Sequence, residues 1–190
     1  MHKGEEAMNT YYFDNGATTK VKDKVLEEMI PYFSEKYGNP SSVYGLARET
    51  KKGIEDAREK VARLIGAQKH EIYFTGCGSE SDNMALKGTM YINKHKNHII
   101  TTKIEHPAIL DTCRFLEKQG FKITYLSVDN QGFIDLNELR NSITEKTALI
   151  SVMFANNEIG TIQSIEDIGK IAKENNVLFH TDAVQAARKC

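Results

Sequence analysis

The sequence predicts an α/β fold in which helices flank a mostly parallel sheet. Two patterns support this prediction: short apolar runs recur along the chain, and amphipathic stretches with a helical period separate them. Because strands that alternate with helices usually join as parallel neighbours, most strand pairs should be parallel. Ligands of such a sheet collect at the carboxyl ends of its strands.

Apolar spacing and terminal residues place the helices. Residues 21–33 carry apolar side chains at every fourth position, and residues 46–65 are followed by Gly66, a residue type that often ends helices. Ser164 and Asp167 have the spacing of a capping box and should open another helix. Further helices are expected over residues 80–94, 107–119 and 134–143.

Five short segments rich in branched and aromatic residues are predicted to be strands. They cover residues 71–75, 98–102, 122–126, 148–153 and 177–181. The fourth is almost entirely apolar, as expected of a strand that is buried on both faces. Only three prolines occur, and no linker rich in glycine or serine divides the chain.

Composition and charge argue against several classes of function. The 190 residues carry a formal net charge of −1, so no field of one sign favours nucleic acid or an anionic membrane. No apolar run has the length of a membrane span, and residues 1–10 lack the apolar stretch of a signal peptide. The three cysteines are scattered, which favours a reducing cytoplasm and argues against a disulfide framework or a metal site.

The loop after residues 71–75 is a candidate phosphate site. It contains Gly76 and Gly78, which allow close approach to the backbone, and Ser79, which is a candidate cap for the next helix. Free N–H groups and the positive end of the helix dipole favour an anion at such a turn. Taken alone, a glycine-rich turn of this kind is more often only a turn.

Polar residues also follow three later strands. His106 follows the second predicted strand, Asn157 the fourth, and Asp182 and Gln185 the last. Each alone has an ordinary explanation as a surface, turn or capping residue. Together with the phosphate-binding turn, they suit a heteroaromatic phosphate: an acid for a ring nitrogen, amides for ring oxygens and a flat ring for stacking.

The sequence resembles the cysteine desulfurases. These are fold type I enzymes of the class V aminotransferase group, and they depend on pyridoxal 5′-phosphate (PLP). The similarity runs from Tyr12 to about Lys189. It rests on motifs that occur in order and at the family spacing: YFDNGATT (12–19), GNPSS (38–42), FTGCGSESDN (74–83), IEHPAIL (104–110), NNEIG (156–160) and HTDAVQ (180–185). The predicted fold is therefore the large domain of a fold type I PLP-dependent transferase.

The resemblance implies roles for the matching residues. Gly78 and Ser79 would hold the cofactor phosphate through backbone N–H groups and the serine hydroxyl. His106 would stack on the cofactor ring and act as a catalytic residue in proton transfer. Asp182 would pair with the ring nitrogen and keep it protonated.

The remaining contacts and the domain organisation also follow from the resemblance. Asn157 and Gln185 would form hydrogen bonds around the phenolic oxygen of the cofactor and the substrate. Residues 1–20 would form an N-terminal extension and substrate-entrance segment, and residues 21–190 a truncated, incomplete PLP-binding large domain. The family usually has Ser-Gly-Ala-Thr where this chain has GCGS at 76–79, and Ser79 keeps the hydroxyl that phosphate binding needs.

The implied activity is conversion of L-cysteine to L-alanine, with transfer of the sulfur to a persulfide for iron–sulfur cluster or other sulfur-carrier biosynthesis. The family's Schiff-base lysine and acceptor cysteine are expected beyond Cys190, so we expect the isolated chain to be an inactive N-terminal half. Selenocysteine lyase, another class V enzyme and a non-catalytic binding scaffold are the alternatives. A pure scaffold would not need the cofactor-facing residues.

The resemblance also implies the setting of the enzyme. The family forms cytoplasmic homodimers that act on L-cysteine and pass sulfur to an acceptor or to an iron–sulfur scaffold protein. We therefore expect these partners for the complete protein, and neither nucleic acid nor a membrane.

Overall fold

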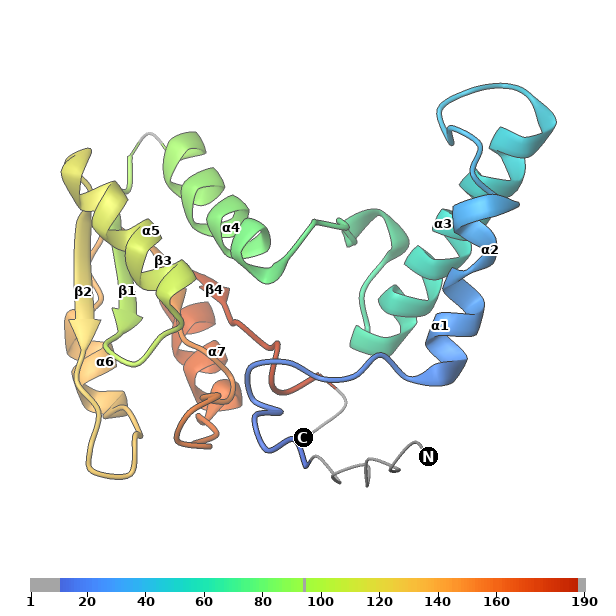
Figure 1. Cartoon of the computed structure of the whole chain (residues 1–190). Helices are drawn as coiled ribbons and strands as arrows, with labels where there is room; N and C mark the ends of the chain where they lie inside the picture. Colours follow the sequence, from blue (N-terminus) through green and yellow to red (C-terminus); the bar gives the residue numbers. More distant parts are fainter. Residues whose placement is uncertain (1–10, 94, 188–190) are drawn as a thin grey trace, which may run out of the picture. The chain divides into compact units, whose positions relative to one another are not determined.

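The computed structural model describes residues 11–93 and 95–187, which form two compact units. The first unit ends at Phe74 and the second begins at Thr75 (Figure 1). The second unit confirms the predicted α/β class, whereas the first is helical. The assignment of residues 1–20 to an entrance segment and of residues 21–190 to a PLP-binding domain remains a prediction, and part of the former lies outside the described residues.

Helices make up the first unit. They are α1 (Asp23–Met29), α2 (Pro31–Ser34), α3 (Gly45–Ile65) and the short 3-10 helix η1 (Lys69–Glu71). The single helix predicted over residues 21–33 is divided, because Pro31 has no N–H to continue the hydrogen bonds of α1 and therefore begins a new helix. Gly66 ends α3 in the left-handed conformation, with φ of 68°, as predicted.

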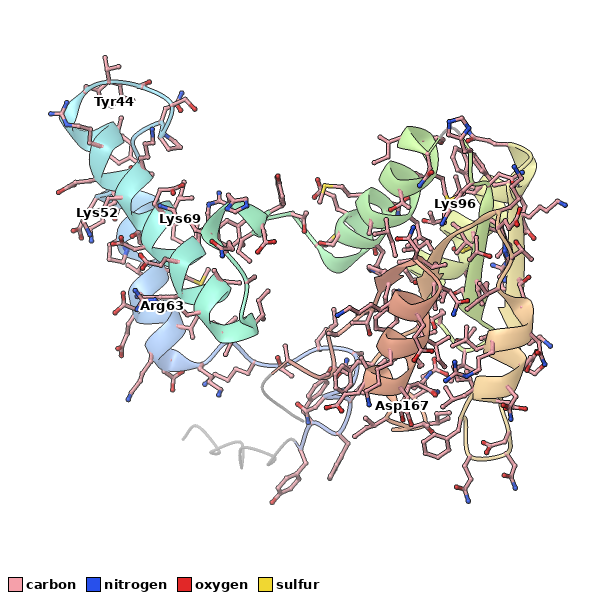
Figure 2. The ribbon with its side chains drawn as sticks, turned by 180° about the vertical axis from the view of Figure 1, so that it is seen from behind. Tyr44, Lys52, Arg63, Lys69, Lys96 and Asp167 are labelled. Carbon is pink, nitrogen blue, oxygen red and sulfur yellow. The ribbon has the colours of Figure 1, made fainter. Side chains whose placement is uncertain are left out.

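Charged side chains line the exposed surface of α3 and η1. Lys52 pairs with Asp56 one turn later at 2.6 Å, and Lys69 of η1 reaches Glu55 at 2.6 Å. Figure 2 shows Lys52, Arg63 and Lys69 along this unit. Such exposed pairs contribute little to stability, so we assign them no functional role.

The strand predicted over residues 71–75 is wrong. Glu71 belongs to η1, and residues 72–75 are not part of any strand, although the backbone of Ile72 is extended. A strand needs a partner that accepts and donates its backbone hydrogen bonds, and no strand in the described part of the chain pairs with this segment. Branched and aromatic residues alone cannot supply that partner.

A parallel sheet lies at the centre of the second unit. Its strands are β1 (His98–Thr102), β2 (Lys122–Leu126), β3 (Thr147–Ser151) and β4 (Leu178–His180). They pair in parallel in the order β2-β1-β3-β4, which confirms the predicted sheet. The helices of this unit are α4 (Gly78–Ile92), α5 (Pro107–Lys118), α6 (Leu136–Ser142) and α7 (Ile165–Glu174).

Helices cover both faces of the sheet (Figure 1). Ile99 packs in a buried cluster with side chains of α4 and α5, whereas its neighbour Ile100 packs in a second cluster with side chains of α6 and α7. Adjacent residues of a strand point to opposite faces, so β1 must be apolar on both. None of the helices in residues 11–93 and 95–187 combines the length and apolar character that a membrane crossing needs.

Ser164 lies at the start of α7, as predicted, but does not make the predicted capping contact. It occupies the N-cap position of α7, as its spacing to Asp167 predicts. Its side chain makes no capping hydrogen bond, so the predicted capping box is not formed. The position of the helix start was therefore right and the predicted contact was wrong.

Candidate functional site

The carboxyl ends of three strands and the start of α4 provide the candidate site. His106 follows β1, Asn157 follows β3, and Asp182 follows β4. Because these strands are parallel, their carboxyl ends share one edge of the sheet. We call the loops at this edge, together with the first turn of α4, the rim. The rim contains all six predicted site residues: Gly78, Ser79, His106, Asn157, Asp182 and Gln185.

The start of α4 has the features of a candidate anion site. Cys77 is the N-cap residue and makes no side-chain capping bond, so the prediction that Ser79 caps the helix is wrong: Ser79 lies within the first turn. The N–H groups of Gly78 and Ser79 precede the first acceptor within the helix and point out of its positive end. Glu80 instead satisfies the N–H of Gly76, at 2.6 Å.

The start of α4 lies against the loop that follows β4. A Cβ atom on Gly78 would be 3.6 Å from Cγ2 of Val184, two residues after Asp182. The carbonyl of Asp182 accepts a hydrogen bond from Phe154 N–H at 2.9 Å, and its Oδ1 accepts one from Val184 N–H at 3.0 Å. These bonds fix the half-buried Asp182 in the loop that lies against the start of α4. Gln185 is also half-buried in this loop.

His106 is held in one orientation by the helix that it caps. It is the N-cap residue of α5, and its Nδ1 accepts a hydrogen bond from Ala108 N–H at 3.1 Å. An acceptor nitrogen carries no proton, so the neutral ring holds its proton on Nε2. The ring is exposed, which leaves its face and Nε2 open to a ligand.

His106 and Asn157 line the same pocket. This pocket has a volume of about 430 Å³ and is formed by residues 103–107 and 156–159. Two loops that are about 50 residues apart in the sequence therefore meet, because they follow the neighbouring parallel strands β1 and β3. Asn157 is exposed in the turn after β3.

Glu105 is a buried carboxyl group behind this pocket. It is 4% exposed, and its Oε1 accepts hydrogen bonds from the Thr102 hydroxyl at 2.8 Å and from Met153 N–H at 3.0 Å. Its Oε2 has no partner among the described residues. Burial raises the pKa of Glu105 to about 7, and the charges of Asp182 and Asp82 also raise it.

The Glu105 carboxyl should make stability depend on pH. Because its folded-state pKa of about 7 lies above the ordinary value of 4.5, its contribution is full below pH 4.5 and is lost as the pH rises through 7. The loss is about 3 kcal/mol. In urea unfolding from pH 4.5 to 8, Glu105→Gln should gain that amount relative to wild type, because both proteins keep Asp82 and Asp182. A difference that is constant with pH would contradict this assignment.

A second set of polar side chains joins α4 to the ends of β3 and β4. Asp82 of α4 is 6% exposed, and its Oδ1 is 3.7 Å from Nε2 of His180. Nδ1 of His180 is 3.0 Å from the hydroxyl of Ser151. Burial raises the pKa of Asp82 to about 6; Asp182 also raises it, whereas His106 lowers it. Asp82 therefore lies close enough to Asp182 and His106 for their charges to affect its ionisation.

Sequence reasoning gave no role to Glu105, Asp82 or His180. All three stand inside the motifs that carry the resemblance, but a polar residue in a loop or helix start usually faces solvent. Burial distinguishes Glu105 and Asp82, and contacts with Asp82 and Ser151 distinguish the half-buried His180. The signal available in the sequence was that Glu105 adjoins His106 and that His180 stands two residues before Asp182.

The two cysteines in the described residues, Cys77 and Cys113, are both free thiols. Cys113 is buried in the core, and burial raises its pKa to about 12, which keeps the thiol protonated. Cys77 is exposed at the start of α4. In the same residues, no group of three or more His, Cys, Asp or Glu side chains is arranged to hold a metal ion.

Known proteins share this sequence and fold. Residues 11–190 match the Aminotransferase class-V family. A protein named cysteine desulfurase IscS from Clostridium botulinum (strain Kyoto / Type A2) is 60% identical over 176 residues, which are 92% of this chain and 44% of that protein. One of the same name from Methanosarcina thermophila is 57% identical with the same coverage.

Solved structures agree with these relatives. A NifS-like protein has a TM-score of 0.90 and 50% identity, and the match covers 92% of this chain and 49% of that one. A structure titled SspA in complex with cysteine has a TM-score of 0.90 and 44% identity, with coverage of 93% and 51%. The chain thus spans about half the length of the proteins that it matches.

Proposed function

The chain belongs to the aminotransferase class-V family, whose cysteine desulfurases use PLP, and we propose that it is the N-terminal, cofactor-binding part of a cysteine desulfurase. The observation that carries this proposal is the convergence on one rim of a helix start with free N–H groups, a half-buried carboxylate and an exposed imidazole. The names of the relatives favour cysteine over selenocysteine as substrate. The activity of the whole protein is part of the proposal, because the chain covers 44% of these relatives.

The residues of the rim fit PLP. The N–H groups of Gly78 and Ser79 and the Ser79 hydroxyl would bind the phosphate at the positive end of α4. Asp182 has one oxygen engaged by Val184 N–H, and its carboxylate would hold a proton on the ring nitrogen. When bound, PLP supplies an electron sink for the carbon that bears the substrate amino group.

The other residues would orient the ring and move a proton. His106 would lie against the ring face, and Nε2 is the atom at which it would give or take a proton, because Nδ1 is engaged by Ala108. Asn157 and Gln185 would donate hydrogen bonds to the ring oxygen and the substrate. A sulfur acceptor or iron–sulfur scaffold protein as partner, a homodimer and a cytoplasmic location extend the proposal and rest on the family resemblance alone.

Recognition of the phosphate group tests the cofactor assignment. We expect the purified chain to bind PLP at least about tenfold more tightly than pyridoxal, which lacks the phosphate, because several hydrogen bonds to a charged group are lost. Ser79→Ala should weaken PLP binding and leave pyridoxal binding unchanged. Titration followed by absorbance gives both affinities, and Ser142→Ala at the end of α6 is the matched control. Equal affinities for PLP and pyridoxal would contradict the assignment.

A further inference from the structure

The loops that carry His106 and Asn157 are joined by two hydrogen bonds that cross the rim. Glu105, next to His106, accepts the N–H of Met153 at 3.0 Å. In the opposite direction, Nδ2 of Asn156 donates to the carbonyl of Ile104 at 2.9 Å. Each bond therefore links a direct neighbour of a site residue to the other loop.

Glu105 replaces a missing strand partner. Past the end of β3, Val152 and Phe154 donate their N–H groups to carbonyls on the β4 side, those of His180 and Asp182. Met153 lies between them, so its N–H points to the β1 side, where the backbone has already turned away toward α5. The Glu105 side chain satisfies this N–H and so extends the junction of β1 and β3 by one more hydrogen bond.

Making that bond with a buried carboxyl group carries a desolvation cost. Taking a carboxyl group out of water is unfavourable unless its oxygens find partners, and Oε2 of Glu105 has none in the part of the chain that is described. Glu105 is also held by the Thr102 hydroxyl on its own strand end. Asn156 is similarly constrained, since its Oδ1 accepts the N–H groups of Glu158 and Ile159 at 2.8 and 3.0 Å.

We propose that Glu105 and Asn156 are positioning residues whose bonds across the rim set the spacing of His106 and Asn157 for the ring of the bound cofactor. The identity of that ligand rests on the proposed function, whereas the link between the loops does not. Neither residue needs to touch the cofactor. Their effect is to make two loops from different parts of the chain move as one.

Substitutions that separate shape from hydrogen bonding test the proposal on the purified chain. Glu105→Gln keeps an oxygen for Met153 N–H and Thr102, whereas Glu105→Ala removes it. Asn156→Asp keeps the acceptor for residues 158 and 159 but removes the donor to Ile104. Leu139→Ala, in the α6 core, is the control for general loss of stability, because Leu139 is fully buried and does not line the pocket.

Two measurements are made on each variant. Hydrogen exchange reports the protection of the Met153 amide, and a PLP titration reports affinity well below the unfolding temperature. In Glu105→Ala we expect Met153 to lose protection and the Kd for PLP to rise about tenfold, as for loss of a buried hydrogen bond. Asn156→Asp should also raise the Kd, whereas Glu105→Gln should stay within about twofold of wild type and Leu139→Ala should leave the Kd unchanged.

The two readouts separate failure of this inference from failure of the proposed function. If the wild-type chain bound no PLP, the proposed function would fail. In that case, loss of Met153 protection in Glu105→Ala would by itself still support the link between the loops. The inference is overturned if Glu105→Ala matches Leu139→Ala in both Met153 protection and PLP affinity. It is also overturned if Glu105→Gln is as impaired as Glu105→Ala.

Discussion

Replacing Asp182 with alanine is expected to lower cysteine-dependent sulfide release by roughly 10³-fold, the scale on which a preorganised electrostatic contact affects turnover. The loop after β4 holds this carboxylate through Phe154 and Val184, and it is the group that would keep the ring nitrogen protonated. Activity is measured on a protein that joins this chain to the region that its relatives have beyond it.

Asp167→Ala is the matched control for the loss of a carboxylate. Asp167 lies in the first turn of α7, is exposed and pairs with Lys170 at 3.2 Å (Figure 2). Its removal should leave sulfide release unchanged. Near-normal activity of Asp182→Ala, or equal losses in the two variants, would show that Asp182 does not serve the cofactor.

The second large effect is expected at Gly132, in the loop that supports the turn after β3. Gly132 has φ of 87°, and an added Cβ would lie 2.5 Å from Cδ1 of Ile159 and 2.7 Å from Oγ1 of Thr161. The carbonyl of Gly132 also accepts a hydrogen bond from Nε2 of Gln163 at 2.6 Å. Gly132→Ala should destabilise the chain by about 3 kcal/mol, through backbone strain and overpacking.

Gly88→Ala makes the same chemical change, but we expect it not to destabilise the chain. Gly88 lies inside α4, and an added Cβ would meet no atom within 4 Å. Alanine favours a helix interior, so this variant should be neutral or more stable by up to about 1 kcal/mol. Urea unfolding of both variants checks the pair. If Gly132→Ala unfolded at the same urea concentration as wild type, the packing of residues 131–132 against 159–161 would be wrong.

Local patterns predicted the elements of the second unit well. The strands over residues 98–102 and 122–126 coincide with β1 and β2, because both segments are rich in the branched and aromatic residues that favour strands. The strand at residues 71–75 failed, because pairing depends on a partner that is distant in sequence. Pro31 divided the first helix at a position where apolar periodicity alone continued.

The candidate site shows the same difference between features that local patterns predict and features that depend on contacts distant in sequence. The order of strands and loops was enough to place His106, Asn157 and Asp182 on one edge of the sheet, since parallel strands end together. The contacts of Glu105 and Asp82 depend on which way their side chains point and on what buries them. Neither property can be obtained from residue types in a motif.

A crystal structure of the chain with PLP tests the central claim most directly. We expect phosphate oxygens within hydrogen-bond distance of the N–H groups of Gly78 and Ser79, the ring nitrogen facing the Asp182 carboxylate, and His106 against the ring face. A phosphate bound away from the start of α4, or a ring nitrogen that faces away from Asp182, would contradict it.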